Sequence, residues 1–187
     1  MSNQPITGNV FGQNQPTTRE FLLEESEKPL TELLSLAEAA RAGLVASLHG
    51  VSEAQASFKP APGAGEEDAY SIIEVLRHVT ASSGTMALRI RALGLDTEIP
   101  ERLGPGSFGD VESMPLSQLA PRLAATLTAV RDAVAAIDGH ERLDTTTPHR
   151  AYGELNCRGY LRLMALHEQD HARQVAAIKA MPGYPER

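Results

Sequence analysis

The sequence predicts an all-α protein, a four-helix bundle of one domain. Ala and Leu are abundant, Trp is absent and aromatic residues make up 4% of the chain, a composition that favours helix over sheet. Four long segments repeat apolar residues at helical spacing, and no segment carries a strand pattern. We expect residues 1–16, rich in Asn, Gln, Gly and Pro, to form a flexible tail, and residues 17–187 to form the bundle.

The first helical segments are marked by their start and stop residues. Thr17 and Glu20 match the S/T-x-x-E capping box, which predicts a helix that begins near residue 18. Pro29 predicts a break, because proline lacks the N–H that a helix interior needs. The first long helix therefore begins after Pro29 and ends at Gly50.

The second long helix begins in another capping box, formed by Ser71 and Glu74. Its apolar residues mark one face, and we expect Gly94 to end it. Residues 95–113 then form a connection longer than ordinary helix–helix links, which predicts a crossover between the second and third long helices.

The third long helix is predicted over residues 116–138, where leucines and valines repeat at helical spacing. Pro121 is close enough to the start to be tolerated, and Gly139 provides the C-terminal cap. Residues 140–156 are predicted to form a loop. The fourth long helix follows from about residue 156 to residue 180.

The charge and the composition exclude several classes of partner. The formal net charge is −7, whereas affinity for nucleic acid depends on clustered Lys and Arg. The nearest approach is Arg77, Arg89 and Arg91, which we interpret as a solvated helix face. The start of the sequence lacks a signal-peptide pattern, and no stretch approaches the roughly 18 apolar residues of a membrane span. We expect a cytoplasmic protein with no nucleic-acid and no membrane partner.

The segment LHEQDHARQ contains the H-E-x-x-H pattern, formed by His167, Glu168 and His171. The two histidines are four residues apart, so on a helix they point the same way, one turn apart. They share a helical stripe with residues expected to face the bundle interior, namely Tyr160, Met164, Gln174, Val175 and Ile178. Two buried neighbouring imidazoles need partners, and a metal ion satisfies both.

A zinc peptidase is one interpretation of this pattern, and it requires a third ligand, usually downstream. Only 16 residues follow His171, none of them a histidine, and Glu186 is the sole carboxylate among them. The extended metzincin pattern requires glycine where this chain has Gln174. We therefore expect the third ligand upstream.

The upstream histidines differ in their predicted surroundings. His49 lies at a helix end, and His140 and His149 lie in a loop, whereas His78 is well inside a predicted helix. It lies roughly 100° from the centre of the apolar stripe, at the flank of the core face. Taken alone, His78 is explained better as a hydrogen-bonded histidine at a helix interface.

Two stretches resemble the DinB-like superfamily of metal-binding four-helix bundles. "FKPAPG…YSIIEVLRHV" is similar to its Pro-Gly loop and second helix, and "GELNCRGYLRLMALHEQDHARQVAAI" to its last helix. The resemblance covers about residues 29–183 and implies an up-down-down-up topology. It also implies that His78, His167 and His171 are metal ligands. Tyr70 stands where the family more often has Trp, and the preceding loop is longer, so the mouth of the site is expected to differ.

Three protein ligands leave positions open for water or substrate, as in a catalytic site. Imidazoles suit Zn²⁺ and Ni²⁺ alike. Of the neighbouring residues, we interpret Glu74 as a capping residue, Glu168 as solvated or interfacial, and Cys157, the single cysteine, as a small interior filler. Gln174 either supports a ligand or packs.

Two functions are consistent with such a site. The first is a metal-dependent enzyme that activates a thiol or water for attack on a small electrophilic substrate; the resemblance implies low-molecular-weight thiols such as mycothiol or bacillithiol as cofactors. The second is a non-catalytic metal-binding protein of the stress response or with a structural role. Exposed apolar residues on the first and third long helices, and the resemblance, suggest a homodimer.

Overall fold

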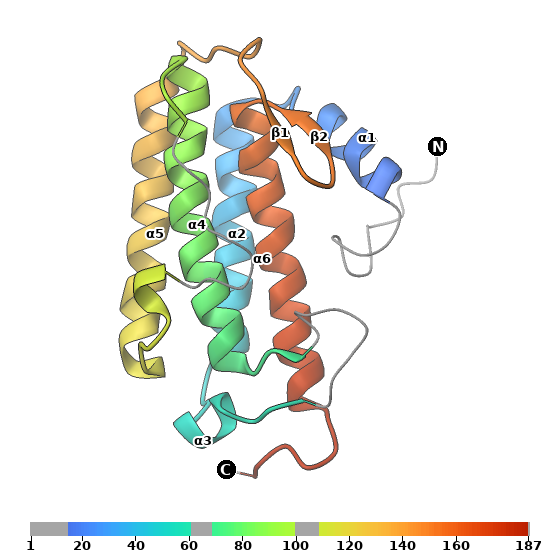
Figure 1. Cartoon of the computed structure of the whole chain (residues 1–187), viewed down its shortest axis with the longest axis vertical. Coiled ribbons are helices and arrows are strands. Elements are labelled where there is room, and N and C mark those ends of the chain that lie inside the picture. The colour runs from blue at the N-terminus through green and yellow to red at the C-terminus, as the bar shows by residue number, and fades with distance from the viewer. Residues whose placement is uncertain (1–14, 61–68, 100–108, 187) are drawn as a thin grey trace.

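Four long helices pack side by side in the computed structural model, which describes residues 15–60, 69–99 and 109–186 (Figure 1). This confirms the all-α bundle. The long helices are α2 (Leu30–Ser47), α4 (Ile72–Leu95), α5 (Leu116–Ile137) and α6 (Cys157–Lys179). The shorter elements are α1 (Gln15–Glu25), α3 (Glu53–Ala56), a 3-10 turn (Gly109–Val111), β1 (Thr147–His149) and β2 (Gly153–Leu155). Among the described residues, no helix has the length and the apolar character needed to cross a membrane.

Helices α2 and α6 run in the same direction. Arg158, at the start of α6, donates to the carbonyl of Lys28 just before α2, and Lys179 at the end of α6 donates to the carbonyl of Ser47 at the end of α2. Helices α4 and α5 run in the opposite direction (Figure 1).

Contacts at both ends also show that α4 and α5 are parallel to each other. Near their starts, the Arg77 guanidinium donates to the carbonyl of Met114 at 2.8 Å. Near their ends, Gly94 faces Ile137, and a Cβ at Gly94 would lie 2.6 Å from the Ile137 side chain. The prediction that Gly94 ends the helix is therefore wrong. Its role is to let the two helices approach, and the helix stops at Asp96, whose φ is 54°.

Apart from the stop at Gly94, most of the predicted helix limits are confirmed, but the N-terminal one is not. The capping box of Ser71 and Glu74 is present, and Gly139 adopts φ 74° after α5. The predicted start near residue 18 is wrong, because α1 begins at Gln15 and Thr17 lies inside it. Of the predicted tail, residues 1–14 lie outside the described residues.

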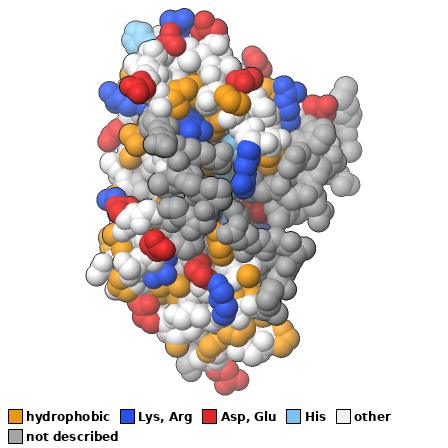
Figure 2. Space-filling view, in the orientation of Figure 1, with side chains coloured by type: hydrophobic (Ala, Val, Ile, Leu, Met, Phe, Trp, Pro, Cys, Tyr) orange, Lys and Arg blue, Asp and Glu red, His pale blue; other side chains and the backbone are white. Residues whose placement is uncertain are grey.

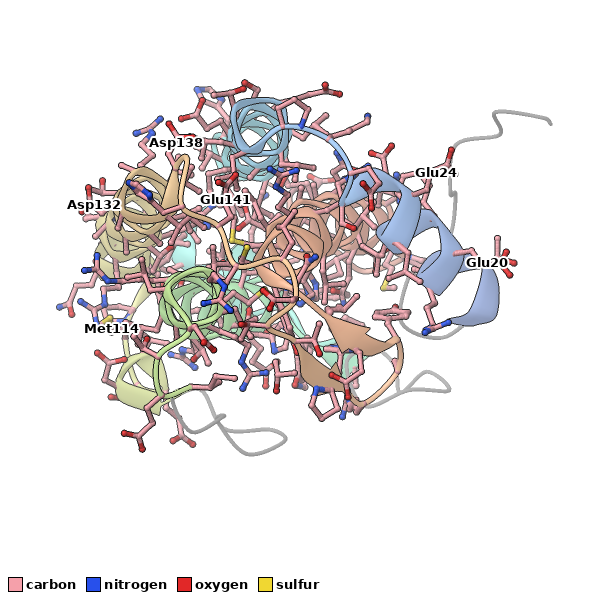
Figure 3. The ribbon with its side chains drawn as sticks, turned by 90° about the horizontal axis from the view of Figure 1, so that it is seen from above. Glu20, Glu24, Met114, Asp132, Asp138 and Glu141 are labelled. Carbon is pink, nitrogen blue, oxygen red and sulfur yellow. The ribbon has the colours of Figure 1, made fainter. Side chains whose placement is uncertain are left out.

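The predicted loop before α6 contains a β-hairpin. Strands β1 and β2 pair antiparallel, with Thr147 opposite Leu155 and His149 opposite Gly153. Arg19 of α1 donates to the carbonyl of Tyr152 in the hairpin turn at 3.0 Å. The hairpin and α1 therefore lie together beside α6 (Figure 1). Seen from above, α1 stands at the side of the bundle with Glu20 and Glu24 directed away from it (Figure 3).

The core divides into two apolar clusters stacked along the bundle axis. One contains the first half of α6 with parts of α1, α2 and the hairpin. The other contains Val175 and Ile178 of α6 with the first half of α4. Between them, α6 contributes three buried residues that can ionise, His167, Glu168 and His171. A polar centre thus interrupts the core. On the face shown in Figure 2, acidic and basic side chains are interspersed.

Candidate metal centre

Three histidine side chains from two helices converge on one point. The Nε2 atom of His167 lies 2.8 Å from Nε2 of His78 and 3.0 Å from Nε2 of His171. All three candidate ligand atoms lie within 4.8 Å of one another, and among the described residues no carboxylate or thiol joins this group. The structure thus brings together the three residues that the sequence singled out.

The helices determine this arrangement. His167 and His171 lie one turn apart on α6, in the gap between the two apolar clusters, and both are buried. His78 enters from the second turn of α4, which runs antiparallel to α6, and it is half-buried. The Tyr70 ring, just before α4, lies 5.9 Å from the His78 ring. The site is therefore closed on the α6 side and more open at His78.

Burial favours the neutral form of two of these imidazoles, those of His78 and His167. It lowers the pKa of His78 to about 4, with a further contribution from the positive charge of Arg150. Burial also holds the pKa of His167 well below its usual value, and the neighbouring histidines add to this effect. A neutral imidazole has a lone pair available for a metal ion. At neutral pH His78 and His167 therefore offer lone pairs to a metal ion.

Gln174 supports one of the ligands. Its Oε1 lies 2.7 Å from Nδ1 of His171, so it accepts the Nδ1–H and leaves the Nε2 lone pair directed at the other two rings. Zn–N bonds of about 2.0–2.1 Å place the nitrogens of a tetrahedral site roughly 3.3 Å apart. The observed Nε2 separations of 2.8 and 3.0 Å are close to this value. The donor set and its geometry fit a divalent ion.

Glu168 does not serve as a base at this centre. It is fully buried, and its two oxygens accept from Arg41 at 2.7 and 2.6 Å. Ser83 donates to it at 3.0 Å. The expected interfacial role is present and the solvated one is not. Because H-E-x-x-H peptidases need this glutamate beside the metal-bound water, the structure argues against the peptidase interpretation.

Arg41 extends this contact to the remaining helix. Its Nη1 donates to the carbonyl of Leu123 and to Thr126 Oγ1, both on α5. The pair therefore joins all four long helices. The sequence indicates this ion pair. Arg41 lies on the apolar stripe of α2, and Glu168 lies one turn from Ala165 and Ala172 on α6. Two opposite charges on two buried stripes indicate an internal ion pair.

The other candidate neighbours have structural roles. Glu74 accepts from the backbone N–H of Ser71 at 2.7 Å and pairs with Lys59 at 2.6 Å, which agrees with its interpretation as a capping residue. Burial raises the pKa of Glu74, but these contacts outweigh it and the net shift is downward. Cys157 is buried, and burial raises its pKa, as expected of an interior filler.

His149 belongs to the surroundings of the site, although it was predicted to lie in a loop. It is buried, its ring stacks on Tyr152 at 4.9 Å, and it lies 6.2 Å from the Tyr160 ring. It is among the residues whose charge would lower the pKa of His167. No periodicity marks His149, because its position depends on the hairpin.

The comparison with known families agrees with this geometry. The sequence model of the DinB superfamily matches residues 36–175. The chain belongs to the DinB superfamily. The match includes all three histidines, and α1 lies outside it. No curated protein and no solved structure matches this DinB-superfamily chain.

Proposed function

We propose that this DinB-superfamily protein is a metal-dependent enzyme that acts on a small electrophilic substrate. His78, His167 and His171 would hold a divalent ion, Zn²⁺ or Ni²⁺. The nucleophile would be a low-molecular-weight thiol in a transfer reaction or water in a hydrolysis. The observation that supports this most is the convergence of three Nε2 atoms with no carboxylate among them in the described residues.

Three ligands distinguish this site from a closed structural one, which has four. When bound, the ion would supply a Lewis acid that makes thiols and water nucleophilic near neutral pH. The chain's own residues hold the ligands: Gln174 orients His171, and the ion pair of Arg41 and Glu168 fixes α6 against the other helices. The half-buried His78 marks the side from which a substrate would enter.

One observation favours a second function, a non-catalytic metal-binding protein. Two carboxylates close to the ligands along their helices are engaged, Glu74 with Lys59 and Glu168 with Arg41. Neither is available as a general base. In this second function the ion would stabilise the bundle without turnover.

An activity assay separates the two functions. The purified protein is loaded with Zn²⁺ or Ni²⁺ and given a thiol together with a chlorinated arene or an epoxide. Metal-dependent conjugation that is lost in His171→Ala and retained in His140→Ala, a change at an exposed histidine, supports the enzyme. Inactivity with every thiol and with water, combined with a large fall in melting temperature on chelation, contradicts the enzyme and supports the second function.

A further inference from the structure

Arg89 is a buried cation without an acidic partner among the described residues. It is 8% exposed, so the interpretation of this residue as part of a solvated face is wrong. Its Nη1 donates to the Tyr160 hydroxyl at 3.3 Å, and its Cζ lies 5.3 Å from the centre of that ring. Its Nε is buried and makes no hydrogen bond. A guanidinium cannot lose its charge in a protein, so this charge is left uncompensated by the part of the chain that the structure describes.

The other two buried arginines each have an acidic partner. Arg41 has Glu168 at 2.6 Å, and Arg162 has Glu25 at 2.9 Å. The chain has 24 acidic residues, yet none in the described part pairs with Arg89. Buried charges are otherwise paired or bound to a ligand. Within the described residues the counter-charge is therefore missing, and a bound anion would supply it.

Arg89 lies on the same seam of the bundle as the histidines. It follows His78 on α4 by three turns and returns to nearly the same side of the helix. Its partner Tyr160 precedes His167 on α6 by two turns, and α6 runs antiparallel to α4. Along the axis the two groups are separated by roughly 10–16 Å. The ring of His149 contacts Tyr160 at 6.2 Å beside this seam.

We propose that Arg89 and Tyr160 bind the carboxylate of a small organic acid. The Nε–H and a neighbouring Nη–H of a guanidinium form two parallel donors that match the two oxygens of a carboxylate. The Tyr160 oxygen accepts from Arg89, and its O–H is then a donor for the same anion. The anion site stands on Arg89 alone; that the other end of the acid reaches the histidines rests on the proposed function.

Binding of benzoate, with the neutral benzamide as its isostere, tests this proposal. Affinity is measured by calorimetry and by melting temperature, in protein treated with a chelator and in protein loaded with Zn²⁺. Benzoate is expected to bind and to raise the melting temperature in both forms, while benzamide does neither. Arg89→Met is expected to lower the benzoate affinity at least tenfold, and Tyr160→Phe to lower it less.

Arg91→Met is the matched control, because Arg91 lies on the same helix, is exposed, and the change in net charge is identical. It should bind benzoate as the wild type does. Without ligand, Arg89→Met should melt no lower than the wild type, since it removes an uncompensated buried charge. Arg89→Lys keeps the charge and should retain part of the affinity.

Two results would overturn the proposal. One is benzoate affinity that is unchanged in Arg89→Met or equal to that of benzamide. The other is benzoate binding that disappears on chelation and persists in Arg89→Met, which would place the carboxylate at the metal and leave the proposed function intact. If Zn²⁺ does not bind the histidines but chelated protein still distinguishes benzoate through Arg89, the proposed function fails and the anion site stands.

Discussion

Arg41 of α2 donates two hydrogen bonds, of 2.7 and 2.6 Å, to the carboxylate of Glu168 of α6 in the buried centre of the bundle. Glu168 is fully buried and adjoins His167 in the chain. Because the pair is also bonded to Ser83 of α4 and Thr126 of α5, it fixes the rotation of α6 about its axis. That rotation decides whether the histidines of α6 face His78.

Removing one member of this pair should destabilise the protein strongly. Glu168→Ala leaves the Arg41 charge buried without its partner and is expected to lower the free energy of unfolding by about 3–5 kcal/mol. Replacing both residues with apolar ones, Arg41→Met with Glu168→Leu, should recover most of this loss. Chemical denaturation measures both variants. A loss below about 1 kcal/mol for Glu168→Ala would show that the pair does not hold the bundle.

The hydrogen bond between Gln174 and His171 should tune metal affinity. Gln174→Leu removes the acceptor of the Nδ1–H and is expected to weaken metal binding about 10–100-fold while the fold is kept. Gln174→Glu retains an acceptor and should bind metal at least as well as the wild type. Competition with a chromogenic chelator gives the affinities, and equal affinity of Gln174→Leu and wild type would rule out a supporting role.

Two glycines in helices should respond oppositely to alanine. Gly94→Ala places a Cβ 2.6 Å from Ile137 and is expected to cost about 1–3 kcal/mol of unfolding free energy. Gly43→Ala meets nothing within 4 Å and should stabilise the protein by about 0.5–1 kcal/mol. Denaturant titrations of the two variants check this. Similar effects of both changes would mean that α4 and α5 do not approach as described.

The ion pair of Glu25 in α1 with Arg162 in α6 should make a pH-dependent contribution to stability. Burial raises the pKa of Glu25, but Lys28 and Arg162 outweigh this and the net shift from 4.5 is downward. Its stabilising contribution is therefore complete above about pH 4.5 and is lost as the pH falls through the lowered pKa of the folded protein. The difference in melting temperature between wild type and Glu25→Gln should be constant from pH 7 to pH 5.

Below pH 4.5 this difference should shrink. Glu24→Gln, at an exposed position directed away from the bundle (Figure 3), is the control. A difference for Glu25→Gln that grows on acidification would contradict the assignment.

The long helices follow from local patterns in the sequence, which explains why they could be predicted. Apolar spacing marked α2, α4, α5 and α6, and the capping box at Ser71 and Glu74 fixed the start of α4. The hairpin was missed because each strand has three residues, too few to show an alternation. Gly94 was misread because a glycine near a helix end resembles a stop signal, whereas its contact with Ile137 exists only in the folded chain.

The candidate site was predictable as far as its residues lie on helical stripes. His167 and His171 share one, and the family resemblance supplied His78. The ion pair between Arg41 and Glu168 depends on which helices pack against each other. The spacing of residues within one helix does not predict this packing. Arg89 was interpreted as solvated from its neighbours Arg77 and Arg91, although Met86 and Leu93 on its own stripe indicate burial.

The central claim is that three histidines hold one metal ion, and elemental analysis tests it most directly. Wild type purified under metal-replete conditions should contain about one equivalent of Zn or Ni per chain. His78→Ala should lose most of it, and His140→Ala should not. Wild type without bound metal, or His78→Ala with the wild-type content, would contradict the claim.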